Sequence, residues 1–159
     1  PYPLSYNGWG DVLVIVFFGF VPVGGTYYVQ TLTWTPDVTI ASLICGLLID
    51  TLLVVNNYRD READARSGKR TVIVRFGEHF GQYLYFILGL SASLLCFWFL
   101  IEGHMFAALL PQLYLIPHII TWKRMKQIHS GKKLNSILGE TSRNMLLLGI
   151  LLSIGMLIN

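Results

Sequence analysis

The feature that most constrains the fold is the alternation of long apolar runs with short polar connections. Five runs are long enough to cross a bilayer, because a membrane helix needs about 20 mostly apolar residues and about 17 can suffice. We predict that these helices span residues 11–30, 39–55, 82–101, 105–122 and 144–158. Charged residues make up only 13% of the chain, against about 25% in soluble domains. The sequence therefore predicts an all-α integral membrane protein, with one membrane domain over residues 1–159.

The distribution of basic residues supports these spans and orients them. The connections 56–79 and 123–143 each hold six Lys and Arg residues, which together are all 12 in the chain. Five spans place both basic connections on one side of the membrane, and the connections 31–38 and 102–104, which hold none, on the other. The positive-inside rule places the basic side in the cytoplasm. We expect a multi-pass protein of the inner (plasma) membrane, with its C-terminus outside and no nucleic-acid partner.

The candidate functional site is the charged stretch 56–71, which follows the second span directly and carries both signs of charge. Asp60 and Asp64 are spaced i, i+4, which places both on one face of a helix. The basic residues around them are Arg59, Arg61, Arg66, Lys69 and Arg70. Most charged connections are only solvated, but a pure orientation signal needs no carboxylates. Because Mg²⁺ takes one or two carboxylates plus substrate phosphates, Asp60 and Asp64 are predicted to hold Mg²⁺ and a phosphorylated substrate.

Asp50 is an ionisable residue inside the second span, where such residues are expensive and mostly functional or paired. If the helix continues past Asn57, then Asp50, Asn57 and Asp64 fall within a narrow arc of one face. Together with Asn56, this polar stripe would lead from the carboxylate pair into a cavity. The alternative is that Asp50 only joins two helices through a Ser, Tyr or Trp partner, and the sequence favours neither reading.

The stretch 56–77 resembles the second aspartate-rich motif of the UbiA-type membrane prenyltransferases. The likeness consists of Asn-Asn-Tyr-Arg-Asp, then Asp64, then Gly-Lys-Arg-Thr followed by Val-Arg-Phe-Gly. The segments 17–30 and 138–143 are similar to the same family, so the likeness covers nearly the whole chain. The paired asparagines and the Val-Arg-Phe-Gly ending resemble the branch that prenylates 1,4-dihydroxy-2-naphthoate in menaquinone biosynthesis.

This resemblance implies nine helices around a central cavity, with two aspartate-rich motifs that bind Mg²⁺ and together hold a polyprenyl diphosphate. The implied reaction transfers the polyprenyl group to 1,4-dihydroxy-2-naphthoate with loss of CO₂ and gives demethylmenaquinol. Asp60 and Asp64 would be the catalytic Mg²⁺ ligands. The implied diphosphate-binding residues are Lys69, Arg70, Arg66 and Asn57. Tyr6 and Arg143 are candidates to bind the carboxylate of the aromatic acid.

The chain departs from the family pattern because it contains one aspartate-rich motif, and its five spans match the family's last five helices. We therefore expect the C-terminal half of a longer enzyme, without the first four helices and the first motif, and inactive alone. One alternative is a sister prenyltransferase whose acceptor is 4-hydroxybenzoate or homogentisate. Another is a transporter or membrane binding module in which Asp50 and the loop carboxylates line an ion path.

Overall fold

The computed structural model describes residues 4–158, and all regular elements in this part of the chain are helices. Five long helical segments are each long and apolar enough to cross a membrane. They are Gly10–Thr31, Pro36–Arg66, Glu78–Leu100, Met105–Ile128 and Leu134–Leu157. Each predicted span falls on one of these segments, so the predicted all-α membrane architecture is confirmed.

The first segment changes its helical geometry along its length. After the short 3₁₀ turn η1 (Leu4–Asn7), it consists of α1 (Gly10–Val14), the π-helical η2 (Ile15–Gly24) and α2 (Gly25–Thr31). Pro22 lies inside the π-helical part and has no backbone N–H to donate, which disfavours regular α-helical bonding there.

The second segment is one continuous helix, α3 (Pro36–Arg66), of 31 residues. Thr35 caps its start by accepting a hydrogen bond from the Val38 N–H at 3.3 Å, and Pro36 suits the first helical position. The helix continues well past the apolar part of the span and beyond Asn57, so the condition for a common face of Asp50, Asn57 and Asp64 is met. Both Asp60 and Asp64 therefore lie on α3.

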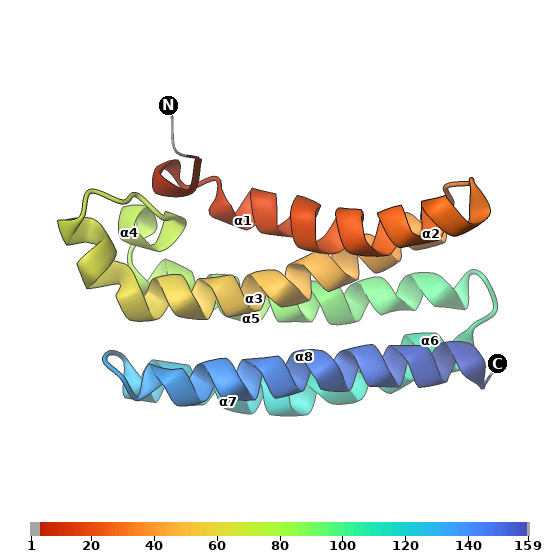
Figure 1. Ribbon diagram of the computed structural model, residues 1–159. Coiled ribbons are helices and arrows are strands. Elements are labelled where there is room, and N and C mark those ends of the chain that lie inside the picture. Colours follow the sequence, from red (N-terminus) through yellow and green to blue (C-terminus); the bar gives the residue numbers. More distant parts are fainter. Residues whose placement is uncertain (1–3, 159) are drawn as a thin grey trace.

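The remaining elements are α-helices, with two short 3₁₀ segments, η3 and η4, among them. They are α4 (Val72–Phe76), α5 (Glu78–Leu95), η3 (Cys96–Leu100), α6 (Met105–Leu109), η4 (Leu110–Tyr114), α7 (Leu115–Ile128) and α8 (Leu134–Leu157). Thr71 caps α4 by accepting a hydrogen bond from the Val74 N–H at 3.2 Å. In Figure 1 the first segment lies along the top, α3 and α5 cross the middle, and α7 and α8 lie along the bottom.

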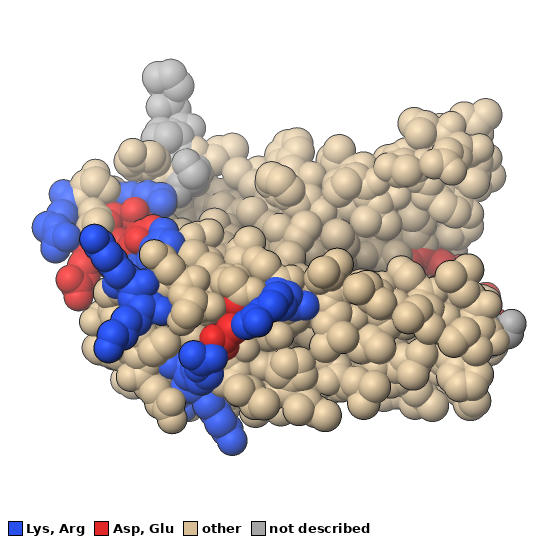
Figure 2. Space-filling model, turned by 60° about the horizontal axis from the view of Figure 1, so that its bottom comes forward, with Lys and Arg blue, Asp and Glu red and all other residues tan. Residues whose placement is uncertain are grey.

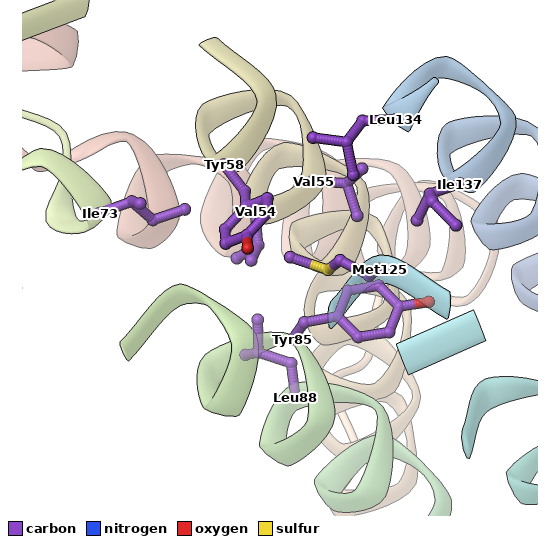
Figure 3. Close-up of a cluster of buried hydrophobic side chains, with 9 residues drawn as sticks. All are labelled: Val54, Val55, Tyr58, Ile73, Tyr85, Leu88, Met125, Leu134 and Ile137. Atoms are coloured by element: carbon purple, nitrogen blue, oxygen red, sulfur yellow. The ribbon is translucent and has the colours of Figure 1, made fainter. Parts of the chain in front are cut away.

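The helix α3 is at the centre of the packing, because it contacts η2, α5 and α8. A buried hydrophobic cluster fills the space between α3, α4, α5, α7 and α8, as Figure 3 shows. Its members are Val54, Val55, Tyr58, Ile73, Tyr85, Leu88, Met125, Leu134 and Ile137. Tyr58 belongs both to this cluster and to the motif, and its hydroxyl accepts a hydrogen bond from Gln82 Nε2 at 2.9 Å. The end of α3 that carries the motif is therefore fixed by its buried face.

Glycines set the register between the first segment and α3, which run antiparallel. A Cβ atom on Gly19 would lie 2.9 Å from Gly46 Cα, and one on Gly46 would lie 2.9 Å from Ile15 Cα, so the backbones touch there. Gly10 faces Leu53 farther along the same contact. This register places the start of α1 beside the residues of α3 that immediately precede the motif.

The charged side chains gather at one end of the bundle. Figure 2 shows the Lys and Arg residues over the left half of the molecule and an uncharged body over most of the rest. These residues come from the end of α3, the α3–α4 connection, α4, the end of α7, the α7–α8 connection and the first half of α8. The two basic connections of the sequence therefore meet at one end, which we call the basic end.

Candidate functional site

Asp60 lies near the end of α3 and is paired with its sequence neighbour. Arg59 donates from Nε and Nη2 to the two carboxylate oxygens of Asp60 at 2.8 and 2.6 Å. The same guanidinium donates from Nη1 to Asn135 Oδ1 on α8 at 2.9 Å. The Asp60 side chain is 44% exposed, and exposed ion pairs are worth only about 0–1 kcal/mol. A ligand with a stronger charge can therefore replace Arg59 at this carboxylate.

Asp64 lies one turn further along α3 and is paired with Lys69. The Lys69 Nζ lies 3.2 Å from Asp64 Oδ2, and the Lys69 backbone N–H donates to the Asp64 carbonyl at 2.9 Å. The Asp64 side chain is only 14% exposed. Each predicted metal ligand is thus paired with a cation of the chain itself.

The other basic residues of the motif have different surroundings. Arg61 covers the Tyr58 ring at 4.6 Å and bonds Glu78 at 3.1 Å, so it fixes the end of α3 to the beginning of α5. Arg66 and Arg70 are exposed at the basic end. The Arg70 backbone N–H donates to the Tyr6 carbonyl at 2.8 Å, which fastens η1 to the motif.

A small polar cavity lies beside the motif, between α1 and α3. Its volume is about 60 Å³, and its lining residues are Gly8, Gly10, Asp11, Leu53, Asn57, Lys69 and Thr71. The structure therefore brings Asn57 and Lys69 to one cavity, as two of the predicted diphosphate-binding residues. Asn57 is buried and Asn56 is half-buried. Asp11 Oδ1 is buried and has no hydrogen-bond partner among the described residues.

Asp50 lies on the same face of α3, two turns before Asn57, and is only 1% exposed. Within residues 4–158, its Oδ1 atom has no hydrogen-bond partner, so the structure offers no Ser, Tyr or Trp to that oxygen. The glycine register places Asp11 near the level of Asp50. The buried face therefore carries two carboxyl groups, not the single one expected from the sequence.

Asp11 and Thr71 are the cavity residues that the sequence interpretation missed. The sequence did contain information that could have placed Asp11 beside the motif. The first two spans are joined by a short connection and must run antiparallel, so the start of the first span lies at the same depth as the end of the second. Thr71 gave no separate signal, because its role as a helix cap depends on where α4 begins.

An apolar trough, which is the second cavity feature, runs between the first segment, α3 and α8. It consists of two adjoining hollows of about 800 and 870 Å³. Residues common to both are Val23, Ala41, Leu152, Ser153 and Leu157. Its lining is mostly hydrophobic, although the second hollow also has polar side chains such as Thr26, Gln30 and Asp37, so its apolar part suits a hydrocarbon chain.

The carboxylate pair fits a Mg²⁺ ion by its chemistry. Asp60 and Asp64 offer hard oxygen donors one helical turn apart, and Asp60 is accessible from outside. No group of three or more His, Cys, Asp and Glu residues that could hold a metal occurs in the described part of the chain. Mg²⁺ commonly uses one or two carboxylates and completes its shell with water and phosphate oxygens, so two carboxylates are sufficient.

The two candidates for binding an aromatic carboxylate lie on different elements. Tyr6 is exposed on η1, and Arg143 is exposed on α8. Nearby on α8, Glu140, Thr141 and Asn144 are buried. Glu140 pairs with Arg124 and accepts a hydrogen bond from Thr121 at 3.3 Å, which ties α8 to α7.

These features define a multi-pass membrane protein with a carboxylate and cation site at its basic end and an apolar trough between its helices. Comparison with known families gives a match to the UbiA prenyltransferase family over residues 1–156. The chain belongs to the UbiA prenyltransferase family, as its central motif suggested.

Individual relatives support the same assignment. The 1,4-dihydroxy-2-naphthoate octaprenyltransferase of Haemophilus influenzae is 37% identical over 98% of this chain and 51% of its own length. The Escherichia coli protein of the same name is 43% identical over 48% of this chain and 25% of its own length. UbiA prenyltransferase domain-containing protein 1 of Dictyostelium discoideum is 30% identical over 100% of this chain and 47% of its own length. The chain thus spans about half the length of relatives that it matches end to end, and no solved structure matches it.

Proposed function

We propose that this chain is part of a membrane-bound prenyltransferase of the inner (plasma) membrane, with its basic end in the cytoplasm. The enzyme transfers a polyprenyl group from an allylic diphosphate to 1,4-dihydroxy-2-naphthoate, with loss of CO₂, and gives demethylmenaquinol. The observation that carries the proposal is the pair Asp60 and Asp64, one turn apart and surrounded by cations, in a chain of this family. The names of the Haemophilus and Escherichia relatives support the acceptor.

The residues at the basic end would bind the diphosphate. Asp60 and Asp64 would hold Mg²⁺, which when bound would neutralise the departing diphosphate as a Lewis acid and a clamp. Lys69 and Arg70 would donate charge-assisted hydrogen bonds to the diphosphate oxygens, which are stronger than neutral ones. Arg66 adds positive charge to the same end, and Asn57 can donate its amide N–H to a phosphate oxygen.

The apolar trough would receive the polyprenyl tail. Most of its lining offers hydrocarbon contacts, and the two hollows together have room for an extended isoprenoid segment. Loss of the diphosphate leaves an allylic cation, which water would destroy. An apolar intramembrane site excludes water and so directs the cation to the aromatic ring.

A sister enzyme with 4-hydroxybenzoate or homogentisate as acceptor would bind the diphosphate at the same basic end. The relatives named for the naphthoate favour the naphthoate acceptor, and the transporter interpretation has no comparable support.

The test is a prenyl transfer assay on the complete open reading frame that contains this sequence, expressed in membranes. Labelled polyprenyl diphosphate and 1,4-dihydroxy-2-naphthoate are supplied with Mg²⁺ or with EDTA. Asp60→Asn and Asp64→Asn should each reduce product by at least about 100-fold, because a metal clamp supplies several kcal/mol at the transition state. Insertion into the membrane should be unchanged.

A control carboxylate lies outside the site and the trough. Glu102 is exposed in the turn between η3 and α6 and lines neither the small cavity nor the two hollows. Glu102→Gln should therefore retain full activity. Turnover that survives Asp60→Asn and Asp64→Asn would refute the site, and product only with another aromatic acid would replace the naphthoate as acceptor.

A further inference from the structure

We propose that Asp11 is a second acceptor for Lys69, so that the Lys69 ammonium passes from Asp64 to Asp11 when a divalent cation binds Asp64. This inference rests on the proposed function, since it takes Asp64 as a metal ligand. It assigns to Asp11 a positioning role when the metal binds, before the diphosphate arrives and becomes an acceptor for Lys69.

A metal that binds Asp64 must replace the ion pair between Asp64 and Lys69. Lys69 Nζ lies 3.2 Å from Asp64 Oδ2. A divalent cation on the same carboxylate would lie within a few ångströms of the ammonium, and like charges at such distances repel strongly where solvent screening is weak. Asp64 is only 14% exposed, so screening there is limited. The ammonium must therefore find another position.

The small cavity beside the motif offers the Lys69 ammonium another position. Lys69 already lines the small polar cavity, and Asp11 lies on the wall of that same cavity. The volume is only about 60 Å³, so the opposite walls lie within the reach of one lysine side chain. Asp11 Oδ1 is buried and has no hydrogen-bond partner among residues 4–158, which makes it an acceptor in need of a donor.

The charges around the cavity favour this destination. Asp50 is nearly inaccessible, and the register of the first segment on α3 places it near the level of Asp11. An unpaired acid inside a membrane helix is costly, so a cation that arrives beside Asp11 removes part of that cost. Release of Lys69 from Asp64 is then compensated by a new contact with buried carboxyl groups.

The backbone allows this change without a rearrangement of the loop. The Lys69 N–H is held by the Asp64 carbonyl at 2.9 Å, and the Arg70 N–H is held by the Tyr6 carbonyl at 2.8 Å. The second bond fastens η1, and so the start of α1, to the motif. Only the flexible stem of Lys69 has to move, while both acceptors stay in place.

The test measures metal binding without turnover. The complete protein is purified in detergent without substrate, and Mn²⁺ binding is followed by electron paramagnetic resonance. Binding to the proposed site is the fraction of bound Mn²⁺ that is lost in the Asp64→Asn variant. Asp11→Asn should weaken this binding by about tenfold, which corresponds to the loss of one charge-assisted hydrogen bond. Glu102→Gln is the control and should bind Mn²⁺ as the wild type does.

A double-mutant cycle separates this role from a general effect on the fold. In a Lys69→Gln background there is no ammonium to transfer, so adding Asp11→Asn should change Mn²⁺ affinity by less than about twofold. Asp11→Glu retains the charge and should bind like the wild type. An equal loss from Asp11→Asn in both backgrounds, or no loss in either, overturns the proposal. If no aromatic acid is prenylated but the cycle shows the coupling, the proposed function fails and the transfer of Lys69 stands.

Discussion

The contact between the first segment and α3 is too close to accept a side chain at Gly19. Gly19→Ala would place a methyl group against the Ser42 carbonyl oxygen and 2.9 Å from Gly46 Cα. Both are backbone atoms, so no side chain can turn away to make room. Ordinary van der Waals contact requires at least 3.4 Å, so the two helices would have to move apart. Overpacking of this kind costs about 1–3 kcal/mol.

The assay is thermal unfolding of the complete protein in detergent, followed by circular dichroism. Gly25→Ala is the matched control, because it lies on the same segment and no described atom outside its own helix lies within 4 Å of the added carbon. Gly19→Ala should lower the melting temperature, and Gly25→Ala should keep it or raise it slightly, since alanine favours helix over glycine by about 1 kcal/mol. Equal melting temperatures for the two variants would refute the close contact and the register derived from it.

Three further substitutions test the supports of the site. Tyr58→Phe removes the buried hydroxyl that accepts a hydrogen bond from Gln82. Because a buried donor is then left unpaired, the free energy of unfolding, measured by chemical unfolding, should fall by about 1–3 kcal/mol. Thr71→Val removes the cap of α4 and should lower the free energy of unfolding by about 0.5–2 kcal/mol, whereas Thr71→Ser keeps a capping hydroxyl and should retain most of that stability. Unchanged proteolysis of the α3–α4 connection in the Val variant would contradict this. Arg124→Ala leaves Glu140, whose side chain is only 9% exposed, without its cation and should lower the melting temperature, whereas the double variant with Glu140→Gln should recover much of the loss.

Much of this architecture follows from the sequence because the membrane simplifies the problem. Apolar length and the position of basic residues depend on single segments, so the five helices could be located without knowledge of their neighbours. The same holds for Asp60 and Asp64, whose common face follows from their spacing once the helix is known to continue. These features are properties of one segment at a time.

The features that the sequence did not reveal depend on contacts between segments. The pairing of Arg59 with Asp60 and of Lys69 with Asp64 could not be distinguished from other pairings among five neighbouring cations. Asp11 looked isolated because its cavity forms only when α1 packs on α3 through glycines. The pairing of Glu140 with Arg124 likewise requires that α7 and α8 lie side by side.

Arg59 has a consequence that extends beyond the carboxylate it holds. One guanidinium joins Asp60 on α3 to Asn135 at the start of α8, two residues that are 75 positions apart in the chain. A ligand that binds Asp60 in place of Arg59 is therefore expected to alter the hydrogen bond between Arg59 and Asn135 as well. A fluorescent label in the loop that precedes α8 should then change its signal when the proposed site is filled.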